Sequence, residues 1–162
     1  MNIADIIAAE RVTRIEDAQS KKRALEQLAE LLAEGSPYLT AGEVFSGLVA
    51  REKLGCTAIG GGVAIPHARM KSIDEAIGAF AHFPGTVAYD ANDERPVDLM
   101  FGLLVPEQST QTHLDLLRAL AELFSQPQYL ADLRNASDDK VLLDALLKHG
   151  AATPTATASG RT

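Results

Sequence analysis

The sequence has a single cysteine, Cys56, in 162 residues. One thiol cannot form an internal disulfide, and it cannot supply a zinc site built from several cysteines. No apolar run reaches the ~18 residues that a membrane-spanning helix needs. The first ten residues contain two acidic side chains and no Lys or Arg, so the basic start of a signal peptide is missing. These absences predict a cytoplasmic protein that is not embedded in a membrane.

The chain also has no excess of positive charge, because 22 Asp and Glu residues outnumber 15 Lys and Arg residues and give a formal net charge of −7. Proteins that bind nucleic acid usually carry a basic stripe, since contacts with phosphate supply most of their affinity. The one tight basic run, Lys21-Lys22-Arg23, lies at the predicted start of a helix and is interpreted as a solvated face. The charge pattern therefore predicts no nucleic-acid partner.

Length and composition indicate one globular domain. A chain with 46% hydrophobic and 23% charged residues is neither disordered nor fibrous, and its length suits a single domain. Residues 151–162 are rich in Ala, Thr, Ser and Pro and show no apolar periodicity. We therefore expect a folded domain over residues 1–150 and a disordered tail over residues 151–162.

Apolar residues at helical spacing predict most of the helices. Such a pattern follows Ser20, a good N-cap, and ends at Gly35, which we expect in the left-handed conformation. The run Thr40-Ala41-Gly42-Glu43 is typical of a capping box and predicts a second helix to about Leu54. Further helices are expected within residues 1–9, after a cap at Ser109 or Thr110, and over residues 128–134 and 137–148.

Short apolar runs predict the strands, at residues 11–16, 63–65, 77–83, 86–89 and 97–105. The last run is almost entirely apolar, as expected for a central strand that is covered on both faces. The alternation of helices and strands predicts an α/β fold, with one sheet flanked by helices on both faces.

The most unusual stretch is residues 51–69, in which Gly60-Gly61-Gly62 precedes Val63-Ala64-Ile65-Pro66-His67. Consecutive glycines permit positive φ or close approach of the backbone to a ligand. They are not a nucleotide-binding P-loop, because Val63 stands where that motif needs Lys followed by Ser or Thr. The alternative is a tight turn between a helix and a strand. His67 follows an apolar strand and a proline, which places its imidazole on a stiff stem at a strand end, where open α/β sheets tend to bind ligands.

Two further residues make His67 a candidate for phosphoryl chemistry. His113 continues the apolar stripe of its helix near the helix N-terminus, where an anion is favoured, and Arg51 ends the helix before the glycines. An imidazole that donates one N–H to a backbone carbonyl keeps its other nitrogen free to attack phosphorus. His113 as a donor and Arg51 as a cation would then neutralise charge on the phosphoryl group. No metal or cofactor is predicted, because no third ligand is evident and a guanidinium repels cations.

Residues 60–67 match the pattern Gly-x-Gly-x-Ala-Ile-Pro-His, the end of an active-site signature. Through this motif the sequence resembles the fructose/mannitol-type enzyme IIA of the bacterial phosphotransferase system. The similarity extends to residues 20–26, 96–99 and 103–106 and covers roughly residues 3–148. It is strongest to the nitrogen-related branch, whose members are free-standing regulatory phosphocarriers.

The resemblance implies a mixed five-stranded sheet, a phosphohistidine at His67, a second site histidine at His113 and a site arginine at Arg51. It implies a phosphotransferase component that receives phosphate from an HPr-like carrier in a relay starting from phosphoenolpyruvate. Regulation of partners such as kinases and ion transporters is the leading hypothesis, because no IIB or membrane domain is attached. The alternative is a sugar-specific IIA that passes phosphate to a IIB domain of a fructose/mannitol-type transporter.

Two other classes of function stay open. A cysteine hydrolase could use Cys56 and His67, but no orienting third residue or oxyanion loop is evident. Cys56 stands where small hydroxyl residues are common in relatives, and we interpret it as a small, partly buried residue. A pure interaction module would usually lack one of Arg51, His67 and His113, and all three are present.

Overall fold

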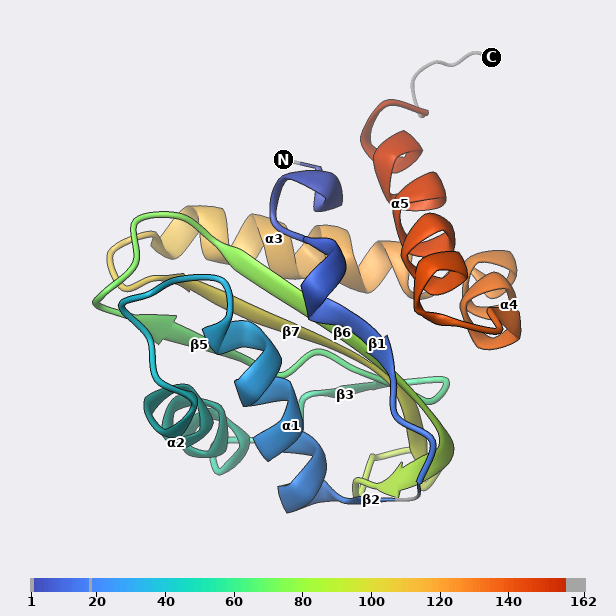
Figure 1. The fold of residues 1–162 in the computed structure, drawn as a ribbon, viewed down its shortest axis with the longest axis horizontal. Helices are drawn as coiled ribbons and strands as arrows, with labels where there is room; N and C mark the ends of the chain where they lie inside the picture. Colours follow the sequence, from blue (N-terminus) through green and yellow to red (C-terminus); the bar gives the residue numbers. More distant parts are fainter. Residues whose placement is uncertain (1, 18, 157–162) are drawn as a thin grey trace.

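The two longest strands form the centre of a single sheet. In the computed structural model, which describes residues 2–17 and 19–156, β6 (Ile77–Ala88) pairs antiparallel with β7 (Val97–Pro106). Short strands extend the sheet on both sides (Figure 1). Parallel to β6 run β1 (Val12–Arg14) and β2 (Gln19–Ser20). Parallel to β7 run β4 (Val63–Ala64) and β5 (His67–Met70), and β3 (Ala58–Gly60) pairs antiparallel with β4.

The mixed sheet agrees with the expectation, but the described residues contain seven strands rather than five. These strands occupy five positions, because β1 and β2 both lie along β6, and β4 and β5 both lie along β7. Pro66 separates β4 from β5 because it has no backbone N–H with which to continue the ladder.

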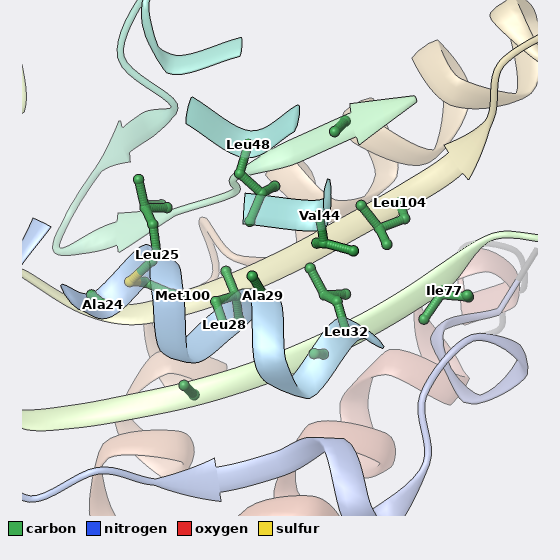
Figure 2. Close-up of a cluster of buried hydrophobic side chains, with 14 of the residues drawn as sticks. Ala24, Leu25, Leu28, Ala29, Leu32, Val44, Leu48, Ile77, Met100 and Leu104 are labelled. Atoms are coloured by element: carbon green, nitrogen blue, oxygen red, sulfur yellow. The ribbon is translucent and has the colours of Figure 1, made fainter. Parts of the chain in front are cut away.

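Helices cover both faces of the sheet, as predicted. On one face lie α1 (Lys21–Ala33) and α2 (Ala41–Glu52), and on the other lie α3 (Thr110–Leu123), α4 (Pro127–Asn135) and α5 (Asp139–Ala156). Alternation along β7 serves both layers: Leu99, Phe101 and Leu103 pack with α3–α5, whereas Met100 and Leu104 pack with α1 and α2. Figure 2 shows the second of these clusters, with Leu28 and Leu32 of α1 directed at the sheet.

The helix ends mostly follow the sequence signals. Ser20 Oγ accepts a hydrogen bond from the Arg23 N–H at 3.1 Å, and Thr40 and Glu43 form the complete capping box. The prediction of a left-handed Gly35 is wrong, because α1 is capped at Glu34 and Gly35 does not take a positive φ. Its small size is needed for packing instead, since a Cβ there would lie 2.5 Å from Ile77 Cγ2.

Two other expectations change in detail. The helix expected within residues 1–9 is replaced by two 3₁₀ turns, Ile3–Asp5 and Ala9–Arg11. The strands expected at 77–83 and 86–89 form one strand, β6, whose register shifts between His82 and Val87. Pro84 and a positive φ of 67° at Thr86 interrupt the ladder there without ending it.

The bounds of α5 include the first residues of the predicted tail, and residues 157–162 lie outside the described residues, so the disordered tail stays a prediction. Within the described ranges, no helix combines the length and apolar character needed to cross a bilayer.

Candidate active site

His67 is the first residue of β5 and lies opposite Leu103 of β7. It follows β4 and Pro66, as the sequence predicted, and it also begins a further short strand that the sequence analysis did not predict. Ala68 and Met70 pack against the α1–α2 layer, so alternation places His67 and Arg69 on the side of α3. The imidazole is 8% exposed. Since β5 has β7 as its one strand neighbour in the described sheet, side chains from α2 can reach this edge.

Two hydrogen bonds define the tautomer of His67. Its Nδ1 lies 2.9 Å from the carbonyl oxygen of Ile65, and its Nε2 lies 3.1 Å from Nε of Arg51. A carbonyl only accepts and a guanidinium only donates, so Nδ1 carries the proton and Nε2 carries the lone pair. Ile65 thus supplies the backbone carbonyl that the sequence argument required.

Burial keeps His67 neutral. Loss of hydration lowers its pKa below the ordinary value of 6.5, and the positive charge of Arg51 lowers the pKa further. The hydrogen bond to Ile65 and the charge of Glu52 oppose this shift but do not overcome it. The Nε2 lone pair is therefore available at neutral pH.

His113 lies in the first turn of α3 and contacts His67 through its ring. The ring centroids are 5.2 Å apart at an interplanar angle of 68°, an edge-on contact, and His113 is 7% exposed. Burial, followed by the charges of His67, Arg69 and Arg51, lowers the pKa of His113 to about 4. Both imidazoles at this site are therefore neutral near pH 7.

Arg51 reaches the site from the last turn of α2, as the sequence predicted. Its Nη1 donates to the Gly55 carbonyl at 2.9 Å while its Nε donates to His67. The structure thus brings together all three predicted site residues at one edge of the sheet.

A buried carboxylate holds the end of α2 in place. The Glu52 side chain is 7% exposed and accepts hydrogen bonds from the Thr57 N–H, the Thr57 hydroxyl and the Tyr89 hydroxyl. Its fourth partner is Lys21, whose Nζ lies 2.9 Å from Glu52 and 4.3 Å from the Tyr89 ring centroid. Lys21 is therefore part of this network, which corrects the interpretation of the whole basic run as a solvated face.

The three glycines do not contribute to the site. Gly60 ends β3, and Gly61 and Gly62 form the tight turn that leads into β4. The carbonyl of Gly62 accepts hydrogen bonds from the N–H groups of Asp98 and Leu99. His67 instead lies opposite Leu103, which is four residues farther along β7 and hence about 13 Å away. The turn is fastened by Arg134, which donates to the Gly61 carbonyl at 2.6 Å and pairs with Asp98 at 2.8 Å.

Cys56 does not have the contacts of a hydrolase nucleophile. It is half-buried, and its Sγ lies 3.8 Å from the Tyr89 carbonyl oxygen. The hydrogen-bond partner of the thiol is therefore a backbone carbonyl and not the imidazole of His67. The geometry therefore favours phosphoryl chemistry over thiol chemistry.

Two polar residues of the site were missed in the sequence analysis, Glu52 and Arg69. Arg69 Nε lies 3.4 Å from His113 Nδ1. A usable signal existed for Arg69, because residues two apart in a strand share a face and Arg69 follows His67 by two. Glu52 gave no such signal, because two of its three partners, Lys21 and Tyr89, are distant in the sequence.

The fold and this site define a IIA component of the bacterial phosphotransferase system. The family model described as "Phosphoenolpyruvate-dependent sugar phosphotransferase system, EIIA 2" matches residues 5–149, and the chain belongs to this family. The nitrogen regulatory protein of Pseudomonas aeruginosa is 46% identical over 123 residues, or 76% of this chain and 80% of that protein. The nitrogen regulatory protein of Bradyrhizobium diazoefficiens is 37% identical over 98% of this chain and its own full length.

Solved structures agree with this assignment. The nitrogen regulatory protein IIA-Ntr of Neisseria meningitidis superposes with a TM-score of 0.81 at 40% identity, covering 89% of this chain and 98% of that one. The fold is also shared with the mannitol IIA of Escherichia coli in its complex with phosphorylated enzyme IIB, with a TM-score of 0.70 and 19% identity over 86% of this chain and 96% of that one. The chain is therefore a phosphotransferase component with a phosphocarrier role.

Proposed function

We propose that the protein accepts a phosphoryl group on Nε2 of His67 from an HPr-like phosphocarrier and regulates partner proteins according to its phosphorylation state. The observation that carries the proposal is the pair of hydrogen bonds on the His67 ring. The Ile65 carbonyl holds the proton on Nδ1, which leaves the lone pair on Nε2.

The transfer step needs no proton movement at His67. The Nε2 lone pair forms the new N–P bond, while the electrons of the broken N–P bond return to the imidazole of the donor. The Nδ1–H group remains hydrogen-bonded to the Ile65 carbonyl throughout the transfer, and this hydrogen bond stabilises the positive charge that develops on the ring. Arg51 must leave Nε2 as the bond forms, and its guanidinium can then donate to the phosphoryl oxygens.

Phosphorylation would act on partners through local charge. It adds a negatively charged phosphoryl group with strong acceptor oxygens beside His113, a buried and neutral imidazole. A partner that covers His67 must bury either the neutral ring or the charged group, and burying that charge without a matching cation is costly. A regulatory target should therefore prefer one form, and each 1.4 kcal/mol of preference changes its affinity about tenfold. Because the donor relay is cytoplasmic, we infer the same location for this protein.

A sugar-specific role is the second candidate. The mannitol IIA that shares this fold is solved in complex with phosphorylated enzyme IIB, and such a IIB domain would be the acceptor here. The identities of 46% and 37% to nitrogen regulatory proteins favour the regulatory role.

Intact-mass measurement tests the proposal after incubation with phosphoenolpyruvate, enzyme I and an HPr-like protein. We expect one phosphoryl group on the wild-type chain, none on His67→Ala, and one on His82→Gln, in which a buried histidine of β6 outside the site is replaced. Full labelling of His67→Ala would refute the site assignment. Adding a IIB domain to the labelled protein separates the two candidates, because only the sugar-specific role predicts rapid loss of the phosphoryl group to IIB.

A further inference from the structure

Arg69 is a second guanidinium at the site, and it contacts the second histidine. It lies two residues beyond His67 on β5 and shares its face of the strand. Its Nε lies 3.4 Å from Nδ1 of His113. Each histidine of the pair therefore has one nitrogen held by its own arginine, His67 by Arg51 and His113 by Arg69.

The contact with Arg69 fixes where the proton of His113 resides. A guanidinium can only donate, so Nδ1 of His113 accepts, and the proton of the neutral ring must be on Nε2. This Nε2 is buried and has no hydrogen-bond partner among the described residues. A buried donor that lacks a partner is unfavourable, and it gains a partner if an anion binds beside it.

We propose that Arg69 is a positioning residue that holds His113 in its Nε2–H tautomer, so that this N–H can donate to the phosphoryl oxygens on His67. The inference rests on the proposed function of His67. The opposite tautomer would direct a lone pair at those oxygens and repel them. His113 thus acts as a neutral donor, and Arg69 sets which nitrogen donates.

The charge of Arg69 supports the same state. It is among the causes that keep the pKa of His113 near 4, after burial and the charge of His67. A protonated His113 would place a third cation beside Arg51 and Arg69. The neutral ring lets His113 donate one directed hydrogen bond without that repulsion.

The direct test is ¹⁵N NMR of the His113 ring in the unphosphorylated protein at neutral pH. We expect an unprotonated Nδ1 and a protonated Nε2 in the wild type and in Arg69→Lys, which keeps a donor. In Arg69→Glu the carboxylate can only accept, so Nδ1 should become protonated. Lys71→Glu is the matched control, because it makes the same charge change at an exposed residue just beyond β5 and should leave the tautomer unchanged. A protonated Nδ1 in the wild type would overturn the inference, whatever labelling shows.

Phosphorylation kinetics test whether Arg69 acts through His113. With phosphoramidate as a small donor, docking charge is irrelevant, and we expect Arg69→Glu to label at least about tenfold more slowly than Lys71→Glu. In a His113→Ala background, Arg69→Glu should have little further effect, because its target is gone. An undiminished effect in that background would show a direct action of Arg69 and overturn the positioning role. Labelling that survives His67→Ala would instead refute the proposed function and leave the tautomer result standing.

Discussion

Nε of Arg51 lies 3.1 Å from Nε2 of His67, so the guanidinium donates a hydrogen bond to the nitrogen that carries the lone pair. The same side chain donates through Nη1 to the Gly55 carbonyl. Arg51 therefore has two tasks in the proposed reaction. It orients the nucleophile before transfer, and it stabilises the phosphoryl oxygens once it has been displaced from Nε2.

Replacing Arg51 should show that its effects depend on its contact with His67 and not only on its positive charge. We expect Arg51→Gln to raise the pKa of His67, because the charge of Arg51 lowers it, and to slow labelling roughly 10²–10³-fold. Histidine titration by NMR and labelling kinetics measure the two effects. Lys53→Gln, at an exposed cation two residues away, is the control and should change neither. Equal effects of the two variants would contradict a specific role for Arg51.

His113→Ala should keep the nucleophile but lose a donor. The variant should still become phosphorylated on His67, with transfer in either direction slower by roughly 10²–10³-fold. Rates of labelling and of return of phosphate to the HPr-like donor measure this. Wild-type rates in both directions would show that the site works without its second histidine.

Stability should fall as the pH is lowered through the histidine range. His67, His82 and His113 all have pKa values below 6.5 in the folded protein, mainly because of burial. The unfolded chain therefore binds more protons than the folded chain between 6.5 and these lowered values, so stability is greatest above pH 6.5. For His113 the loss continues down to about pH 4.

Urea unfolding at a series of pH values tests this prediction. The free energy of unfolding should be lower at pH 5 than at pH 7.5, and His113→Gln should reduce the difference. A free energy that is unchanged or higher at pH 5 would show that the histidines are not held neutral by the fold.

The glycine turn should matter for stability and not for phosphorylation. Both Gly61 and Gly62 have positive φ. A Cβ added at Gly62 would lie 2.7 Å from Arg134 Nη2 and 2.8 Å from Asp98 Oδ1. A Cβ added at Gly61 would have no neighbouring atom within 4 Å among the described residues. Gly62→Ala should therefore cost at least about 1 kcal/mol more than Gly61→Ala, which pays only backbone strain. Thermal melts and His67 labelling, measured together, test this. Impaired labelling of His67 in a well-folded Gly61→Ala variant would show that the turn contributes to the phosphorylation site.

Local sequence signals predicted most of the fold because they act over a few residues. Ser20 and the Thr40–Glu43 capping box fix the starts of two helices through hydrogen bonds between residues three positions apart. The apolar run at 97–105 could become only a central strand. Gly35 was misread because its small size serves a contact with Ile77, which is distant in sequence.

Site residues could be predicted where their neighbours in the sequence are distinctive. Contacts between segments that are distant in the sequence could not be predicted in this way. His67, His113 and Arg51 had distinctive neighbours in the sequence. The glycines allowed either a ligand contact or a tight turn in the sequence analysis. The structure has the turn, because an extended backbone from Gly62 to His67 separates the two along β7. The Glu52 network joins α1 and α2 to Thr57 and to Tyr89, the residue after β6, and no spacing rule connects these segments.

The most direct test is to locate the phosphorus on the protein. In ¹⁵N-labelled protein that has been phosphorylated by the HPr-like donor, ³¹P–¹⁵N coupling should appear at Nε2 of His67, while Nδ1 remains protonated against the Ile65 carbonyl. Coupling at Nδ1 of His67, or at any other histidine, would contradict the orientation that Ile65 and Arg51 impose on this ring.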